Sequence, residues 1–171
     1  MHSFSDCQIE LNSPCELGQI PTQIPDGKFT KKSAYRRIEE NVEVMADLAK
    51  RLYAENQRSI LLVLQGMDTA GKDGTIRAVM RGMNPTSCQV SSFKKPSEEE
   101  LDHDFLWRIH QRVPRRGNIG IFNRSHYEDV LVVKVHNLVP KPVWSKRYDT
   151  IIAFERLLHD NGTTVVKCFL H

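Results

Sequence analysis

The stretch from residue 59 to residue 74 holds the residues with the clearest capacity for phosphate chemistry. An apolar run at residues 60–64 leads into Gly66, and Gly71 and Lys72 follow with the spacing GxxxxGK. Glycines let backbone N–H groups face an anion, the start of a helix adds partial positive charge, and the lysine bridges phosphoryl oxygens. The pattern predicts a strand, a phosphate-binding loop and a helix. Besides Lys72, the expected phosphate ligands are Gly66, Met67, Thr69, Ala70, Gly71, Asp73 and Gly74.

Asp73 departs from the usual form of such a loop. It stands where a Ser or Thr hydroxyl normally holds magnesium. The alternative to a phosphate site is a glycine-rich strand-to-helix turn with a solvated Lys72. We favour the phosphate site because both flanking elements have the required type.

A second dense polar cluster, NRSHYED, occupies residues 123–129 directly after an expected strand. Arg124 can pair bidentately with a phosphoryl group, and Glu128 and Asp129 offer the hard oxygen ligands that suit magnesium. A purely structural alternative is a helix start capped by Ser125, but this leaves Arg124 unexplained. His126 is a weak candidate for a base, because phosphoryl transfer relies mainly on positioning and electrostatics.

Lys94 and Lys95 follow another expected strand, at residues 88–93. Open α/β sheets bind ligands at the carboxyl ends of their strands, so a phosphate contact and plain solvation are equally compatible with these two lysines. The next helix is expected to begin with a capping box at Ser97. Its buried stripe would consist of Leu101, Phe105, Leu106 and Ile109. The acidic and histidine residues of this helix do not have the spacing of a metal site.

The remaining pattern predicts an α/β fold. Residues 31–57 form an amphipathic helix with the stripe Tyr35, Ile38, Val42, Met45, Leu48 and Leu52. Further strands are expected at residues 118–122 and 163–170, with a helix at about residues 145–159 between them. The stripe of that helix would be Tyr148, Ile151, Ile152, Glu155 and Leu158. Strands separated by helices imply a mainly parallel sheet with helices on both faces.

Length and composition indicate one domain. The chain has 171 residues, is 40% hydrophobic and carries a formal charge of +3. We expect an irregular arm at residues 1–30 and a core at residues 31–171. No apolar run approaches the roughly 18 residues of a membrane span, and the first residues do not resemble a signal peptide, so we expect a cytoplasmic protein. The four cysteines have no metal-ligand spacing and are expected to be free thiols.

Three segments, taken in order, resemble the polyphosphate kinase 2 family: GMDTAGKDG, FKKPSEEELDHDFLWRIHQRVP and GNIGIFNRSHYEDVLV. The resemblance extends over about residues 33–171. It implies a P-loop kinase-like three-layer sandwich, phosphoryl transfer between inorganic polyphosphate and AMP, ADP or ATP, a need for Mg²⁺, and a homo-oligomer.

Carried over by motif position, the resemblance implies roles for individual residues. Asp68 and Lys72 would be the essential catalytic pair, and Arg124 would clamp phosphates. Mg²⁺ would be held by Asp68 and Glu128. Nucleotide contacts would come from Asn123, Tyr127 and Glu128. The form NRSHYED resembles the branch of the family that phosphorylates both AMP and ADP.

The resemblance also gives the basic residues a purpose, because polyphosphate is a linear polyanion. We expect six of them to cluster around the two motifs: Lys94, Lys95, Arg112, Arg115, Arg116 and Arg124. The family continues beyond the last strand into a basic helical lid, so residues 1–171 are expected to bind phosphate compounds better than they turn them over.

Two other functions remain open from the sequence. One is an ATP-dependent kinase of a small metabolite, which would share the phosphate loop but need ATP as donor. The other is a non-catalytic module that binds polyphosphate or a nucleotide. Nucleic-acid binding is not expected, because the basic residues lack interleaved aromatic side chains.

Overall fold

The computed structural model describes residues 8–10, 13–22 and 30–171. Much of the expected arm lies outside the described residues, so the boundary at residue 30 stays a prediction. In chain order the elements are η2 (Leu17–Gln19), α1 (Lys31–Glu55), β1 (Ser59–Gly66), α2 (Lys72–Met80), η3 (Pro85–Ser87), β2 (Cys88–Ser92), α3 (Glu98–Leu101), α4 (Trp107–His110), β3 (Ile119–Asn123), α5 (Glu128–Val135), α6 (Lys141–Trp144), α7 (Arg147–Asp160) and β4 (Thr163–Leu170).

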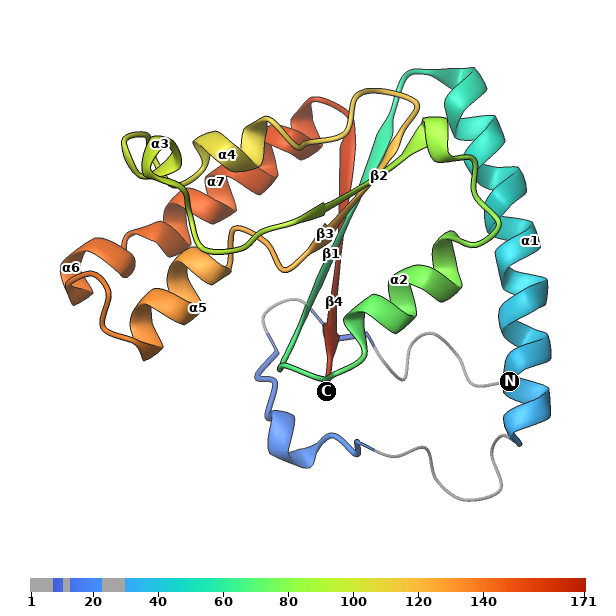
Figure 1. Cartoon of the computed structure of the whole chain (residues 1–171), viewed down its shortest axis with the longest axis horizontal. Helices are drawn as coiled ribbons and strands as arrows, with labels where there is room; N and C mark the ends of the chain where they lie inside the picture. The colour runs from blue at the N-terminus through green and yellow to red at the C-terminus, as the bar shows by residue number, and fades with distance from the viewer. Residues whose placement is uncertain (1–7, 11–12, 23–29) are drawn as a thin grey trace.

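Four strands form one sheet in the order β2-β3-β1-β4 (Figure 1). Every strand pairing is parallel, and β1 lies inside the sheet because it pairs with both β3 and β4. The register sets Leu64 of β1 opposite Asn123 of β3, so both strands end at the same edge. The predicted parallel α/β fold is therefore confirmed, and the predicted strand at residues 163–170 has the observed bounds.

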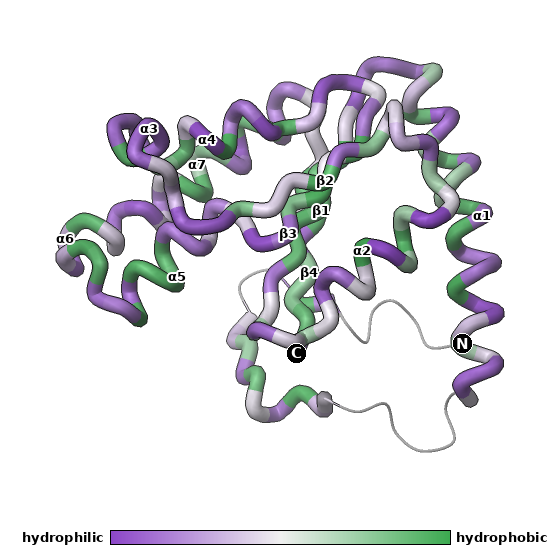
Figure 2. Tube along the Cα trace, viewed as in Figure 1, coloured by the Kyte–Doolittle hydropathy of each residue, from purple (hydrophilic) through white to green (hydrophobic). Residues whose placement is uncertain are grey.

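Helices cover both faces of the sheet, with α1 and α2 on one face and α3 to α7 on the other (Figure 1). Successive side chains of a strand point to opposite faces. Leu61 and Val63 accordingly join the main core with Phe122, whereas Ile60 and Leu62 face α1 and α2. Figure 2 shows the hydrophobic residues concentrated along the strands at the centre of the molecule.

The predicted first helix is confirmed as α1, but its apolar stripe is only partly buried. Val42 and Ala49 are buried, while Tyr35, Ile38 and Leu48 are exposed. The helix packs against α2. Tyr35 and Ile38 both lie in the first third of α1, and among the described residues these first turns extend beyond α2 (Figure 1).

The single helix predicted after Ser97 is wrong, because the chain breaks it into α3 and α4. The Asp104 carboxylate accepts a hydrogen bond from Leu106 N at 2.9 Å, and His103 stacks on Trp107 with ring centroids 4.0 Å apart. These local interactions turn the chain between the two helical pieces. As a result Leu101 is 65% exposed, whereas Leu106 and Ile109 enter the core as expected.

The segment between β3 and β4 holds three helices, α5, α6 and α7, of which only the last was predicted. In α7 the expected stripe is correct at Ile151 and Leu158 but wrong at Ile152, which is 56% exposed. Phe154 is buried in its place. Helix α7 packs against α5, α6 and β4, so the buried face has to meet several elements and does not follow one regular stripe.

Two further expectations can be compared with the described residues. Cys15, Cys88 and Cys168 are free thiols, as predicted, and Cys7 lies outside the described residues. Among the helices of the described ranges, none combines the length and the apolar character that crossing a membrane requires.

Phe122 is expected to be the most sensitive position of the core. Its side chain is fully buried and meets Phe93 edge to face, with centroids 4.8 Å apart. We expect Phe122→Ala to lower the free energy of unfolding by about 3–5 kcal/mol, because it leaves a cavity among residues that cannot collapse into it. Urea unfolding measures the loss. Phe169→Ala, at a position that is 46% exposed, is the control and should cost less than half as much. Equal losses would contradict the assignment of the core.

Candidate active site

The predicted phosphate loop (residues 66–74) connects β1 to α2. Gly66 passes so close to β4 that a Cβ atom there would lie 2.7 Å from the Leu170 carbonyl oxygen. Thr69 and Gly71 both have positive φ angles, 68° and 87°. Left-handed residues this close together are compatible with a backbone concavity that suits an anion. The prediction that the loop binds phosphate stays a prediction.

Lys72 is the first residue of α2, and its side chain turns back over the loop. It is 9% exposed, and its ammonium group donates hydrogen bonds to the carbonyl oxygens of Gly66 at 2.7 Å and Met67 at 2.8 Å. A buried ammonium group needs such partners to offset the loss of hydration. The alternative of a solvated Lys72 is thus wrong, and the charge is held beside the loop.

The two predicted motifs meet in one cleft of about 260 Å³ at the carboxyl edge of the sheet. The parallel pairing of β1 with β3 brings the ends of these strands together. Gly66 and Met67 are not among the lining residues and contribute only carbonyl oxygens to Lys72. The cleft is lined by Asp68, Thr69, Ala70, Gly71, Lys72, Asp73, Gly74, Asn123 and Arg124.

Arg124 links the two motifs through its guanidinium group. One nitrogen donates to the Asp68 carboxylate at 2.7 Å, and the other lies 3.9 Å from the Glu128 carboxylate. Its backbone N–H donates to the Leu64 carbonyl oxygen at 3.1 Å, and its φ angle is 63°, in the left-handed region. Left-handed backbone costs free energy at a residue other than glycine, so the surrounding structure must hold Arg124 in this conformation.

Asp73, the unusual residue of the loop, has a partner from the second motif. The Asn123 side-chain amide donates to its carboxylate at 2.6 Å. This contact keeps a carboxylate at the mouth of the cleft, near the start of α2. The departure from the usual loop sequence is therefore matched by a specific contact from β3.

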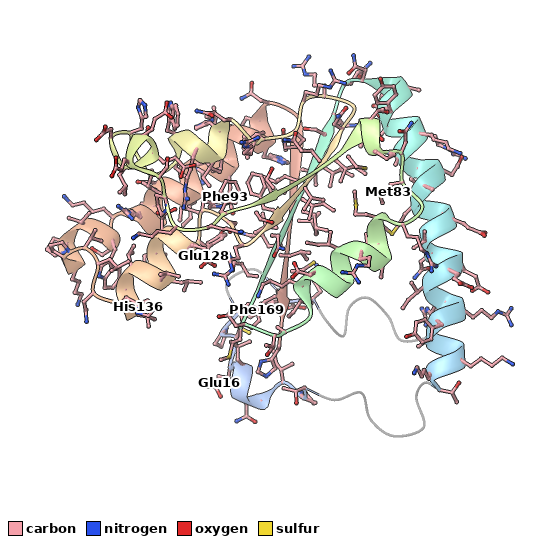
Figure 3. The ribbon with its side chains drawn as sticks, viewed as in Figure 1. Glu16, Met83, Phe93, Glu128, His136 and Phe169 are labelled. Atoms are coloured by element: carbon pink, nitrogen blue, oxygen red, sulfur yellow. The ribbon has the colours of Figure 1, made fainter. Side chains whose placement is uncertain are left out.

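Tyr127, predicted to bind nucleotide, and Glu128, predicted to bind both nucleotide and Mg²⁺, do not line the cleft. Figure 3 shows Glu128 at the start of α5, on the same side of the sheet as Phe93. The Gln65 amide, with its nitrogen facing α5, donates to Glu128 at 3.0 Å. Tyr127 points into the core, and its hydroxyl donates to Glu155 at 2.8 Å.

The six basic residues expected around the motifs separate into three places. Only Arg124 lies in the loop cleft, whereas Lys94, Lys95 and Arg112 line a second cleft of about 400 Å³ beside β2. Arg115 and Arg116 line a third cleft with Tyr53 and belong to the amino edge of the sheet. The expectation for this pair was wrong because the two arginines precede β3, and residues before a parallel strand lie at the edge opposite the ligand.

Asp129, whose carboxylate suited magnesium by its type, is held in a buried ion pair and does not line the cleft. It is 9% exposed, and Arg108 donates to its carboxylate at 3.2 Å. Arg147 donates to its backbone carbonyl oxygen at 2.7 Å. Burial raises the pKa of Asp129, and the neighbouring Arg108 opposes that rise. The sequence offered no signal for this pairing, because the two residues are distant along the chain.

The residues of the cleft fit Mg²⁺ only if bound phosphates supply part of its coordination shell. Within the described ranges no group of three or more acidic, histidine or cysteine side chains has the arrangement of a metal site. Asp68 and Asp73 do line the cleft and supply hard oxygen donors. Mg²⁺ commonly takes one or two carboxylates and completes its shell with substrate phosphates and water, which this pair satisfies.

A polar network behind the cleft escaped the sequence analysis. His126, which is fully buried, lies 3.4 Å from the Glu155 carboxylate, and Lys167 donates to the same carboxylate at 2.7 Å. His126 therefore has no access to a substrate. Burial alone raises the pKa of Glu155, but hydrogen bonds from His126, Lys167 and Tyr127 outweigh burial and lower the pKa to about 2.

Glu155 is expected to make the stability of the fold depend on acid. Its pKa is lowered from 4.5, so its contribution is present above pH 4.5 and is lost as the pH falls towards 2. We expect this loss to reach roughly 2 kcal/mol in the free energy of unfolding and to be absent in Glu155→Gln. Urea unfolding between pH 5.5 and 3 measures the difference. Glu40→Gln, at an exposed ion pair with Arg36, is the control, and a pH-independent difference between wild type and Glu155→Gln would contradict the assignment.

Comparison with known proteins places this geometry in context. The family model described as polyphosphate kinase 2 (PPK2) matches residues 28–171. An AMP/ADP-polyphosphate phosphotransferase of Meiothermus ruber is 53% identical over 162 residues, which cover 86% of this chain and 61% of that protein. An ADP-polyphosphate phosphotransferase of Rhodopseudomonas palustris is 48% identical, with 91% of this chain and 58% of that protein covered.

A solved structure that resembles this chain belongs to the same family. The crystal structure of polyphosphate kinase 2 from Arthrobacter aurescens superposes with a TM-score of 0.89 at 36% identity, covering 97% of this chain and 60% of that one. The chain thus spans about 60% of the length of these relatives.

Proposed function

Because the chain belongs to the polyphosphate kinase 2 family, we propose that it transfers phosphoryl groups between inorganic polyphosphate and AMP or ADP. The observation that supports this most strongly is the meeting of Lys72, Asp68 and Arg124 in one cleft. Two cations and a loop of backbone N–H groups surround a space that is open to a chain of phosphates. Names of relatives that specify AMP, ADP and polyphosphate point to the same substrates.

Each group has a role that follows from its charge and place. Lys72 and the loop N–H groups hold oxygens of the phosphoryl group being transferred, and Arg124 binds them from the opposite motif. An oxygen of the terminal nucleotide phosphate attacks the terminal phosphorus of polyphosphate, and the bond to the next phosphate breaks. Mg²⁺ held by a carboxylate such as Asp68 would neutralise the phosphate oxygens.

The contacts of the ligand-free cleft show what binding must change. Arg124 pairs with Asp68, and Lys72 bonds to loop carbonyl oxygens. A phosphate chain would replace the Asp68 carboxylate as the partner of Arg124, which releases that carboxylate to bind Mg²⁺. The two binding events would therefore favour each other.

The assembly and cellular context are part of the proposal. We propose a homo-oligomer, which the resemblance to the family supports, and a location in the cytoplasm. We propose no nucleic-acid partner, since the six basic residues expected around the motifs are divided among three separate clefts.

The test separates the donor from the acceptor. The purified chain is incubated with AMP or ADP and Mg²⁺, with either polyphosphate or ATP as donor, and the nucleotides are resolved by ion-exchange chromatography. We expect AMP and ADP to gain phosphates from polyphosphate with no ATP supplied, but slowly, because residues 1–171 are expected to bind phosphate compounds better than they turn them over. Transfer from ATP alone would favour a conventional kinase, and saturable polyphosphate binding without transfer would favour a binding module.

A further inference from the structure

Arg124 lies on a turn whose other residues are anchored on the side away from the cleft. We call residues 124–127 the Arg124 turn. Ser125 is fully buried, and its hydroxyl donates to the Gln65 amide oxygen at 2.8 Å. His126 is also fully buried and packs between the rings of Phe122 and Phe154. Arg124 is therefore the residue of the turn that faces the cleft, and the residues that follow it anchor the turn in the core.

The anchors at His126 and Tyr127 converge on one carboxylate. His126 Nε2 lies 3.4 Å from Glu155 Oε1, and the Tyr127 hydroxyl donates to the same oxygen at 2.8 Å. Lys167 donates to Glu155 Oε2 at 2.7 Å and lies 3.2 Å from the Tyr127 hydroxyl. Glu155 thus joins two consecutive residues of the Arg124 turn to α7 and, through Lys167, to β4.

This anchorage accounts for the conformation of Arg124. The backbone there is left-handed, which a non-glycine residue keeps only when its neighbours hold it. Two of the three following side chains are held by Glu155. The low pKa of Glu155 means that the anchor stays charged at all physiological pH values, so the attachment is constant.

We propose that Glu155 is a positioning residue that acts through the Arg124 turn to aim the Arg124 guanidinium group into the phosphate cleft. This inference rests on the proposed function. Glu155 does not line the cleft and touches no reacting group. It sets the direction of the one arginine that the second motif supplies to the phosphates.

A double-mutant cycle distinguishes this role from simple stabilisation of the fold. Binding of Mg²⁺-tripolyphosphate is measured by calorimetry, up to millimolar concentrations, for wild type, Glu155→Gln, Arg124→Ala and the double variant. We expect Glu155→Gln to weaken binding about tenfold when Arg124 is present. In the Arg124→Ala background the same substitution should weaken binding by less than twofold. Equal weakening in both backgrounds would overturn the proposal. Glu55→Gln, which removes an exposed helical partner of Arg58 at the opposite edge of the sheet, is the matched control.

A second measurement needs no ligand. The Arg124 amide, bonded to the Leu64 carbonyl oxygen, should exchange its hydrogen at least tenfold faster in Glu155→Gln. The Ile60 amide, bonded to the Asn118 carbonyl oxygen at the far end of the same strand pair, should be unaffected. Unchanged exchange at Arg124, or equal acceleration at both amides, would overturn the inference. If wild type fails to bind tripolyphosphate, the proposed function fails, and this exchange measurement still decides whether Glu155 holds the turn.

Discussion

Lys72→Ala is expected to lower polyphosphate-dependent phosphoryl transfer by about a hundred- to a thousandfold. The ammonium group lies over the loop, where it would meet the charge that develops on the phosphoryl oxygens. Removing one such donor from a preorganised site typically has an effect of this size. The loop itself should keep its fold. The carbonyl oxygens of Gly66 and Met67 lose only the donor that Lys72 supplies, and Met67 is exposed to solvent.

Initial rates of ATP formation from ADP and polyphosphate measure this effect. Lys72→Arg keeps the charge but needs more room in a position that is only 9% exposed, so it should still lose at least tenfold. Lys50→Ala, at an exposed lysine of α1, is the matched control and should keep full activity. Transfer by Lys72→Ala within a factor of three of wild type would exclude the loop as the phosphate site.

Arg124→Ala is the second change with a large expected effect, again about a hundredfold or more. This substitution removes the only arginine that lines the cleft and leaves the Asp68 carboxylate without its 2.7 Å partner. Arg124→Lys should recover part of the loss, since an ammonium group supplies charge but not two parallel hydrogen bonds. The change should appear in the KM for polyphosphate as well as in kcat, because the proposed role of Arg124 is to bind the phosphates in both the ground state and the transition state.

The control for Arg124 is Arg36→Ala, which removes an exposed arginine paired with Glu40 on α1. Thermal melting of each variant shows whether the fold is kept. If Arg124→Ala turns over polyphosphate at the wild-type rate while melting normally, the second motif has no part in phosphate binding. The proposal that Arg124 binds phosphates opposite Lys72 would then be wrong.

The sequence predicted those parts of the molecule that local patterns determine. The glycine spacing, the apolar run before it and the helix after it led directly to the phosphate loop. The strand at residues 163–170 was predicted with its observed bounds, because β-branched residues follow a clear helix end at Gly162. The meeting of Arg124 with the loop followed from a general rule, since both motifs come after strands of a parallel sheet.

Features that depend on tertiary contacts were not predictable in this way. The pairing of Arg108 with Asp129, and that of His126 with Glu155, join residues from separate helices and turns. No periodicity or motif identifies such partners, so the ion pair that buries Asp129 could not be predicted. Arg115 is a different case, because it precedes β3 in the sequence, and residues before a parallel strand lie at the edge of the sheet opposite the ligand.

The order of the strands in the sheet is also known only from the structure. A parallel α/β pattern is compatible with several strand orders, and the observed order β2-β3-β1-β4 is one of those that set β1 beside β3. This adjacency allows Arg124 to reach Asp68 and Asn123 to reach Asp73. The general rule places both motifs at one edge of the sheet, and the adjacency of β1 and β3 brings their side chains into contact.

The most direct test of the phosphate site is a hydrogen-exchange footprint of Mg²⁺-tripolyphosphate on the wild-type chain, read amide by amide. We expect slower exchange at residues 69–73 and at Arg124, and no change at residues 115–118 of the amino edge. Lys72→Ala should lose the footprint without losing the protection of the sheet. Protection confined to the cleft of Lys94 and Lys95, or to residues 115–118, would contradict the proposal that the phosphate loop and Arg124 together bind the phosphate chain.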